Sequence, residues 1–143
     1  MKNYLAISFI TALIGFTACD FTDHNVSLPK NAPVYANLTF IDFYSLQINE
    51  SKASYLAGHV IQMQGYFKYY QRVHHRLNKH LGKFQASLGA NTNTFSEDVD
   101  CFFCDSIPPP KSYSIVTLKG IMFKEGGYIG LKNCIVMDSA EKN

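Results

Sequence analysis

From position 58 onward, short apolar runs alternate with polar residues, and glycines, prolines and other turn-forming residues separate the runs. A period of two is typical of β-strands that bury one face. Gly65 interrupts the first run and predicts a bend at which the sheet curls toward closure. With 47% hydrophobic residues the chain can fill one packed core. Because the apolar period is two, we expect a mainly β fold. The runs predict five strands, at residues 59–70, 84–88, 99–103, 112–120 and 128–137.

The stretch before these strands, residues 39–57, predicts one helix. Thr39 is suited to cap its start, and Asp42 three residues later completes a capping box. Apolar side chains then recur near one helical face, and a stripe of this kind usually faces the core. We therefore expect the stripe to be buried rather than to form a ligand groove. Its members are Ile41, Tyr44, Ile48 and Tyr55.

The N-terminus has the layout of a secretory signal. Lys2 supplies a positive start, residues 4–16 are apolar, and two small residues precede Cys19. The apolar run is too short to span a bilayer, because polar residues follow it directly. The segment Phe16-Thr17-Ala18-Cys19 resembles the lipobox of bacterial lipoproteins, with Phe in place of the usual Leu. The resemblance implies cleavage before Cys19 and acylation of that residue; the alternative is an ordinary signal or an uncleaved apolar helix.

The chain thus divides into a signal peptide at residues 1–18, a flexible tether at 19–36 and one folded domain at 37–143. We expect a lipid-anchored protein of the bacterial cell envelope that meets the membrane through acylated Cys19. An exported address favours disulfides and disfavours nucleic acid as a partner. The net charge of +2 is too small to imply a polyanionic partner by itself. An envelope protein, an acidic glycan or an acidic lipid remains as a candidate partner.

Four segments spread over the chain follow the pattern of a known family. They read NESKASYLAGHVIQMQG at 49–65, VDCF at 99–102, VTLKG at 116–120 and LKNCIV at 131–136. Their order and spacing resemble the tRNA-anticodon-binding-like OB-fold lipoproteins, a bacterial family of largely unassigned function. The resemblance implies a small five-stranded OB-like barrel preceded by one α-helix, over nearly the whole mature body. Relatives often carry a second cysteine just after the VTLKG glycine, where this chain has Ile121 and Met122, so Cys134 lacks that partner.

Besides Cys19, the chain has three cysteines, and this odd number predicts one disulfide and one leftover thiol. Cys101 and Cys104 form a C-x-x-C motif that runs into Asp105 and the prolines at 108–110. This sequence cannot begin the helix that a thioredoxin-like motif requires, and it lacks the histidine needed to attach haem. The candidates for the disulfide are therefore Cys101, Cys104 and Cys134.

Strand alternation separates the two neighbouring cysteines. On a regular strand Cys101 lies on the uncharged face, which predicts that it is buried, and Cys104 lies on the other. Cys134 shares a face with Lys132, so a bridge to Cys101 requires a bulge or an inward-facing Lys132. A bridge to Cys104 requires neither, so strand parity slightly favours it.

The region from residue 68 to 83 is basic, and no acidic residue occurs from 51 to 96. Val73, Leu77 and Leu81 recur every four residues and predict a short helix within it. Anionic lipid headgroups or acidic glycan are the partners that suit an envelope protein, and the alternative is a solvated basic face. The anion-binding candidates are Lys68, Arg72, Arg76, Lys79 and Lys83.

No nucleophile with a base and an orienting acid can be identified, and Gly126-Gly127 is typical of a hairpin turn rather than a phosphate cradle. We therefore expect a non-enzymatic binding or assembly module, with no cofactor and no metal. One alternative is a metal-binding or thiol-redox protein that uses the three cysteines with His74, His75 or His80. A second alternative is a basic surface anchor for anionic lipid or glycan.

Overall fold

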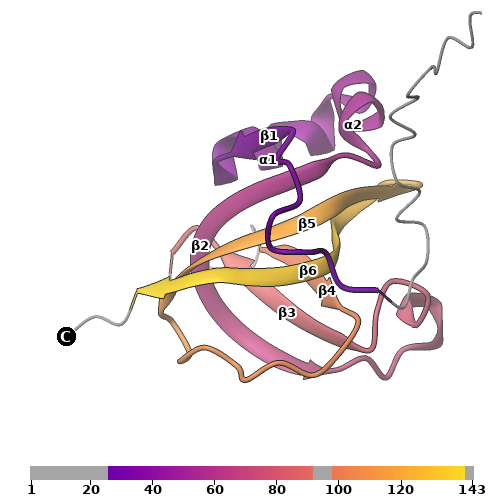
Figure 1. Cartoon of the computed structure of the whole chain (residues 1–143). Coiled ribbons are helices and arrows are strands. Elements are labelled where there is room, and N and C mark those ends of the chain that lie inside the picture. Colours follow the sequence, from indigo (N-terminus) through magenta and orange to yellow (C-terminus); the bar gives the residue numbers. More distant parts are fainter. Residues whose placement is uncertain (1–25, 92–97, 141–143) are drawn as a thin grey trace, which may run out of the picture.

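In residues 26–91 and 98–140, which the computed structural model describes, six strands form one sheet that closes into a barrel (Figure 1). The predicted signal peptide and Cys19 lie outside the described residues. The elements are, in order, β1 (Ala36–Leu38), α1 (Phe40–Ile48), α2 (Glu50–Leu56), β2 (Val60–Arg72), the 3-10 helix η1 (Arg76–Asn78), β3 (Phe84–Gly89), β4 (Val99–Phe103), β5 (Ile115–Glu125) and β6 (Tyr128–Ala140).

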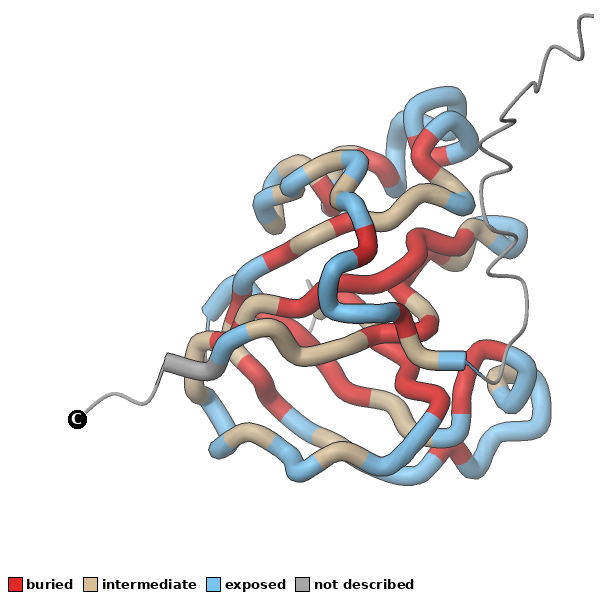
Figure 2. Tube along the Cα trace, in the orientation of Figure 1, coloured by how far each residue is buried: buried red, intermediate tan, exposed pale blue. Residues whose placement is uncertain are grey.

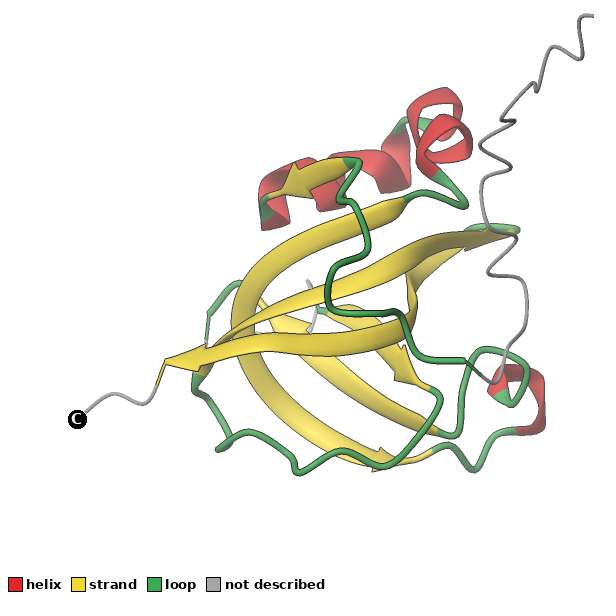
Figure 3. Ribbon diagram, in the orientation of Figure 1, coloured by secondary structure: helices red, strands yellow, loops and turns green. Residues whose placement is uncertain are grey.

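The long strand β2 closes the barrel because it pairs with two different neighbours. Its first half runs antiparallel to β5 and its second half antiparallel to β3, with the change at Tyr66 next to the predicted bend at Gly65. Strands β2, β3, β4, β6 and β5 follow one another around the barrel, and β1 adds a short parallel edge to β2 (Figure 3). The predicted mainly β fold with a five-stranded OB-like barrel is confirmed.

The helical region consists of two helices rather than the predicted single one. Thr39 caps α1 and forms the expected capping box with Asp42, in which the Asp42 amide donates to the Thr39 Oγ1 at 3.2 Å. Asn49 then ends α1, and its side-chain oxygen accepts a hydrogen bond from the Lys52 amide at the start of α2. An asparagine side chain that caps a new helix explains why the first helix stops there.

Strands β5 and β6 are both longer than predicted and form a hairpin at the expected turn. Gly126 has a φ of 61°, a conformation that glycine adopts without steric penalty. On β6, Asn133 has a φ of 54°, and Asn133 and Cys134 together oppose the single residue Gly120 on β5. This is a β-bulge, and it turns Cys134 toward the barrel interior.

Residues 26–36, predicted as the end of a flexible tether, instead pack along the barrel. Leu28 and Ala32 are buried against Ile121, and the Leu28 amide donates to the Asn133 carbonyl. Two apolar side chains and the backbone hydrogen bonds hold this segment, although its sequence has no helical or strand period. The folded body therefore begins well before residue 37.

Candidate functional site

The outer face of α1 is apolar and exposed, which contradicts the prediction that it faces the core. Ile41, Tyr44 and Ile48 recur along one side of the helix, with 82%, 51% and 86% of their surfaces exposed. We call these three residues the α1 stripe. Phe43 and Leu46, on another side of the helix, are buried in the core instead. Figure 2 shows α1 at the edge of the molecule, with exposed and buried residues interleaved along it.

Glycine at position 65 explains why α1 takes this orientation. A Cβ built on Gly65 would overlap the ring of Phe40, so the ring lies directly against the backbone of β2. Phe40, Phe43 and Leu46 then fill the space over the barrel. The face of α1 that carries Ile41 and Ile48 stays exposed. Tyr55 on α2, the fourth residue of the predicted stripe, is also exposed.

A second aromatic group lies beside α2. The rings of Tyr35 and His59 are stacked, with centroids 4.0 Å apart, and the hydroxyls of Tyr35 and Tyr55 are hydrogen-bonded. This hydrogen bond is the largest contribution that raises the pKa of Tyr35. The contacts connect the segment before β1 to α2 and fix the position of the helices on the barrel.

The predicted anion-binding residues fall into two groups, because Lys68 is not at the surface. It is 5% exposed, and its Nζ lies 2.7 Å from the Asp98 Oδ1. The Ser87 hydroxyl donates to the other oxygen of Asp98 at 2.6 Å. Lys68 lies at a register shift between Phe67 and Tyr69 and is buried against Asp98, so it is part of the packed structure and is excluded from an anion site.

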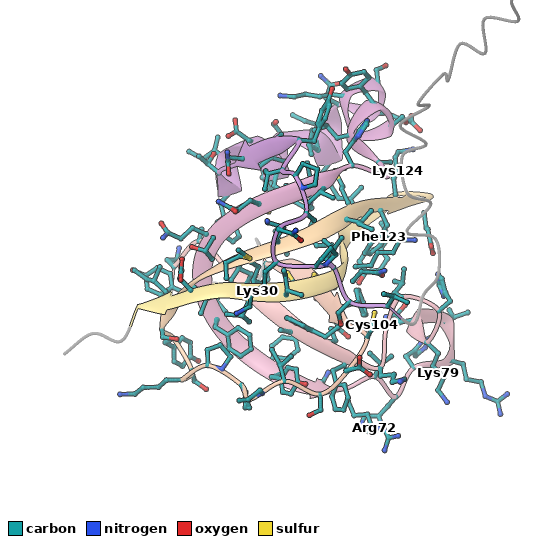
Figure 4. All side chains as sticks on the ribbon, in the orientation of Figure 1. Lys30, Arg72, Lys79, Cys104, Phe123 and Lys124 are labelled. Carbon is teal, nitrogen blue, oxygen red and sulfur yellow. The ribbon has the colours of Figure 1, made fainter. Side chains whose placement is uncertain are left out.

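The other four candidates lie on or beside the connection between β2 and β3, residues 72–83, which we call the basic loop. Arg72, Arg76, Lys79 and Lys83 are exposed there, and Figure 4 shows Arg72 and Lys79 pointing away from the barrel. Lys83 forms an exposed ion pair with Asp105 at 3.4 Å. Among the residues that the structure describes, the other three cations of the loop form no such pair.

Apolar contacts hold the basic loop against the barrel, and the predicted short helix does not form in it. Val73 and Leu81 are buried in a cluster with Phe102 and Phe123, whereas Leu77 is 73% exposed. Only the 3-10 turn η1 forms, and His80 at its far side contacts Glu125 at 2.7 Å. Both ends of the loop are thus fixed to the barrel, and Leu77 extends into solvent between Arg76 and Lys79.

The three cysteines are buried, and the structure groups Cys134 with Cys101. The Cys101 and Cys134 thiols are hydrogen-bonded inside the main core, whereas the Cys104 thiol is hydrogen-bonded to Ser27. None of the three forms a disulfide. Cys101 is buried in the core as predicted, but Cys104, which was predicted to lie on the other face of the strand, is also buried, with 1% of its surface exposed. The preference for a Cys104–Cys134 pair stays a prediction: the bulge at Asn133 supplies the geometry that a Cys101–Cys134 pair requires, and Cys134 also acts on the Cys104 thiol.

Neither thiol of the C-x-x-C motif is suited to redox catalysis. The hydrogen bond to Cys134, followed by burial, raises the pKa of Cys101 well above its ordinary value. Burial, followed by the charge of Asp105, raises the pKa of Cys104. A reactive cysteine needs an accessible thiolate, which these environments disfavour. Within the described ranges, no three histidine, cysteine or acidic side chains come together as a metal site, so His74, His75 and His80 do not join the cysteines.

A polar cluster that was not predicted lies on the outer face of the barrel around Asp100 on β4. Its carboxylate accepts hydrogen bonds from Tyr128 at 2.7 Å and Gln85 at 2.8 Å, with a longer contact from Tyr69. Burial, followed by the charge of Asp100, raises the pKa of Tyr69 to about 12, and burial also raises the pKa of Tyr128. Because neighbouring donors already occupy the carboxylate, the cluster stabilises the sheet face and leaves little capacity for a ligand.

In the part of the chain that the structure describes, no helix combines the length and the apolar character needed to cross a membrane. Comparison of the chain with protein-family models, with the curated proteins and with the solved structures finds no match in any of the three.

Proposed function

We propose that this protein is an exported bacterial lipoprotein, anchored in the cell envelope through acylated Cys19, whose barrel domain binds a protein partner without catalysing a reaction. The α1 stripe is the observation that carries the proposal, because two isoleucines and a tyrosine on one helical face are held in contact with water. A contiguous exposed apolar face is typical of an interaction surface. A ridge of this kind fits the recognition mode in which a helix lies in an apolar groove.

The size of the α1 stripe argues against a dimer that is held by the stripe alone. Three partly exposed side chains present roughly 400 Å² at most, whereas a stable interface buries about 800 Å² on each partner. A symmetric contact through the stripe alone is therefore too small. A partner whose groove extends beyond the stripe to Tyr55 and Tyr35 buries a larger area, and both of these residues are exposed.

The charge on the barrel surface argues against nucleic acid. OB-folds commonly bind oligonucleotides on the face of the strands that correspond here to β3 and β4. In this chain that region carries Asp98 and Asp100, and only Asp98 is paired with a lysine. The remaining negative charge repels phosphate, which supports a protein as the ligand.

Charged substitutions in the α1 stripe test the proposal. We expect the double variant Ile41→Glu/Ile48→Lys to weaken partner binding at least tenfold, since central apolar anchors contribute most of the binding energy. The charges complement the helix dipole, so the free energy of unfolding should change by less than about 0.5 kcal/mol. Cross-linking in intact cells followed by mass spectrometry measures recovery of the partner, and urea denaturation measures stability.

The matched control is Tyr113→Asn, which removes an exposed aromatic side chain from a different part of the surface. The cross-linked partner should be retained by this control and lost from the double variant. An unchanged set of cross-linked proteins in the double variant would contradict the docking surface. The intact mass of the membrane-extracted protein tests the anchor separately, because an uncleaved and unmodified N-terminus excludes acylation at Cys19.

Export to an oxidising compartment leads to a prediction about the cysteines. We expect refolding of the reduced protein with oxidised glutathione to join Cys101 to Cys134 and to leave Cys104 as a thiol, because the first two are in contact in the core. Such a bridge closes a loop of about thirty residues and contributes ~3 kcal/mol in the loop-entropy model. Peptide mapping identifies the bridge. Cys104→Ser should keep it and Cys134→Ser should lose it, whereas a bridge that contains Cys104 would contradict this prediction.

A further inference from the structure

The start of the described chain and the basic loop lie at the same end of the barrel. The Ser27 side chain is hydrogen-bonded to Cys104, and the charge of Lys83 at the end of the loop acts on the same thiol. The Lys83 ammonium also pairs with Asp105, the residue after Cys104. Figure 1 shows the indigo start of the described chain at this end, close to the loop in that view.

Chain length places this end near the membrane. Cys19 is seven residues before Val26, and Asn133 fixes the Val26 carbonyl to the barrel through a hydrogen bond of 2.8 Å. Seven residues span at most about 25 Å even when fully extended. An acyl chain on Cys19 therefore keeps Val26, at the end of the barrel that carries the basic loop, within about that distance of the lipid surface.

The chemistry of the basic loop suits a lipid headgroup layer. Among the described residues, Arg72, Arg76 and Lys79 have no carboxylate within ion-pair distance, and all three are exposed. Leu77 lies between the last two with 73% of its surface exposed. Cations attract anionic lipids, and an apolar side chain among them can enter the interfacial region. Glu125 and Asp105 are the nearby acids, and they face His80 and Lys83.

The loop is also held in a fixed position, which lets it orient the whole domain. Val73 and Leu81 anchor its two ends in a buried cluster, and the contact between His80 and Glu125 holds its far side. In Figure 1 the helices α1 and α2 lie on the other side of the barrel from the start of the described chain. A domain that rests on the loop would thus direct the α1 stripe away from the lipid.

We propose that the basic loop docks on an anionic phospholipid surface, through Arg72, Arg76 and Lys79 with Leu77 inserted, and so presents the α1 stripe to a partner. The inference rests on the lipid anchor of the proposed function. It assigns the two surfaces separate roles. The loop binds lipid, and the stripe binds protein.

The chain contains no tryptophan, so a single substitution provides a specific reporter. The experiment uses the mature acylated protein with Leu77→Trp, reconstituted in vesicles of phosphatidylcholine alone or with added phosphatidylglycerol. We expect the emission to shift to the blue, and to be quenched by brominated acyl chains, only in the anionic vesicles. High salt should reverse the shift, because it screens exposed charges. Each cationic residue should contribute about fivefold to the docking equilibrium.

Two controls separate docking from anchoring and from the protein-binding surface. Adding Arg72→Gln, Arg76→Gln and Lys79→Gln to the reporter should remove the shift, while Ile48→Trp on the α1 stripe should show none in either vesicle. Equal Leu77→Trp spectra in both vesicles, or a shift that survives the three glutamines, would overturn the inference. In either case the cross-linked partner can still be retained, which leaves the proposed function standing. A shift at Ile48→Trp would overturn both.

Discussion

Asp98→Asn should lower the free energy of unfolding by about 3 kcal/mol, because it removes the charge that pairs with the buried Lys68 ammonium. The side chain of Lys68 is 2% exposed, and that of Asp98 is 11% exposed. Removing one member of a buried ion pair is much more damaging than removing both, because the remaining charge stays desolvated. Urea denaturation monitored by circular dichroism measures the change.

Two further variants make the Asp98 prediction specific. The double variant Lys68→Met/Asp98→Asn should recover most of the stability, since it removes both charges and keeps both side-chain volumes similar. Asp105→Asn breaks the exposed pair with Lys83 and should change stability by less than about 0.5 kcal/mol. A loss below about 1 kcal/mol for Asp98→Asn would show that water or another group compensates Lys68, and would contradict the buried pair.

The barrel could be predicted from the sequence because its signals are local. A period of two marks each strand, and glycine pairs or polar runs mark the turns. The capping box at Thr39 and Asp42 likewise lies within four residues of sequence, and the structure contains it. These features need no knowledge of what packs against them.

The face of α1 could not be predicted, because both of its sides are apolar. Phe43 and Leu46 form one helical face, and Ile41 and Ile48 belong to another. Periodicity detects an apolar face but does not choose between two. Which face is buried depends on a residue that is distant in sequence, because the backbone at Gly65 leaves room for the aromatic ring of Phe40. The predicted core stripe is for this reason the exposed one.

Irregularities in the strands explain why two side chains do not lie where strand alternation placed them. A bulge at Asn133 reverses the parity that would have pointed Cys134 away from Cys101. A register shift beside Lys68 buries a lysine directly after the buried Phe67. One inserted residue changes the face of the side chains that follow it, so strand alternation alone could not locate these two.

The packing of residues 26–36 was missed because the contacts that hold them come from distant strands, and a buried lysine supplies two of these contacts. Lys119 on β5 is 4% exposed, and its Nζ donates hydrogen bonds to the Lys30 carbonyl at 2.8 Å and the Ala32 carbonyl at 2.9 Å. These contacts join segments almost ninety residues apart in sequence. They fix the direction in which the chain leaves the barrel toward Cys19, and with it the position of the basic loop relative to the anchor.

Lys119→Met should release this segment while the barrel stays folded. Two hydrogen bonds from a charged donor are lost, each of which contributes about 1.5–3 kcal/mol, so local stability should fall by about 3 kcal/mol. Ser27 in this segment covers Cys104. A loss of about 3 kcal/mol in local stability raises the population of molecules in which the segment is open roughly 100-fold. We expect alkylation of Cys104 in the folded, reduced protein to become faster by up to that factor, with Cys101 and Cys134 still protected.

The control for Lys119→Met is Lys124→Met, which lies on the same strand and pairs with the exposed Glu50 at 3.1 Å. An exposed pair contributes little, so this variant should leave the alkylation of Cys104 within about twofold of the unmodified protein. Mass spectrometry of labelled peptides reports the cysteines separately. Equal acceleration at Cys101 and Cys104 would indicate global unfolding, and no acceleration at Cys104 would show that Leu28 and Ala32 hold the segment without the lysine. Selective exposure of Cys104 would establish Lys119 as the contact that fixes the exit of the anchor, and therefore the orientation on which lipid docking depends.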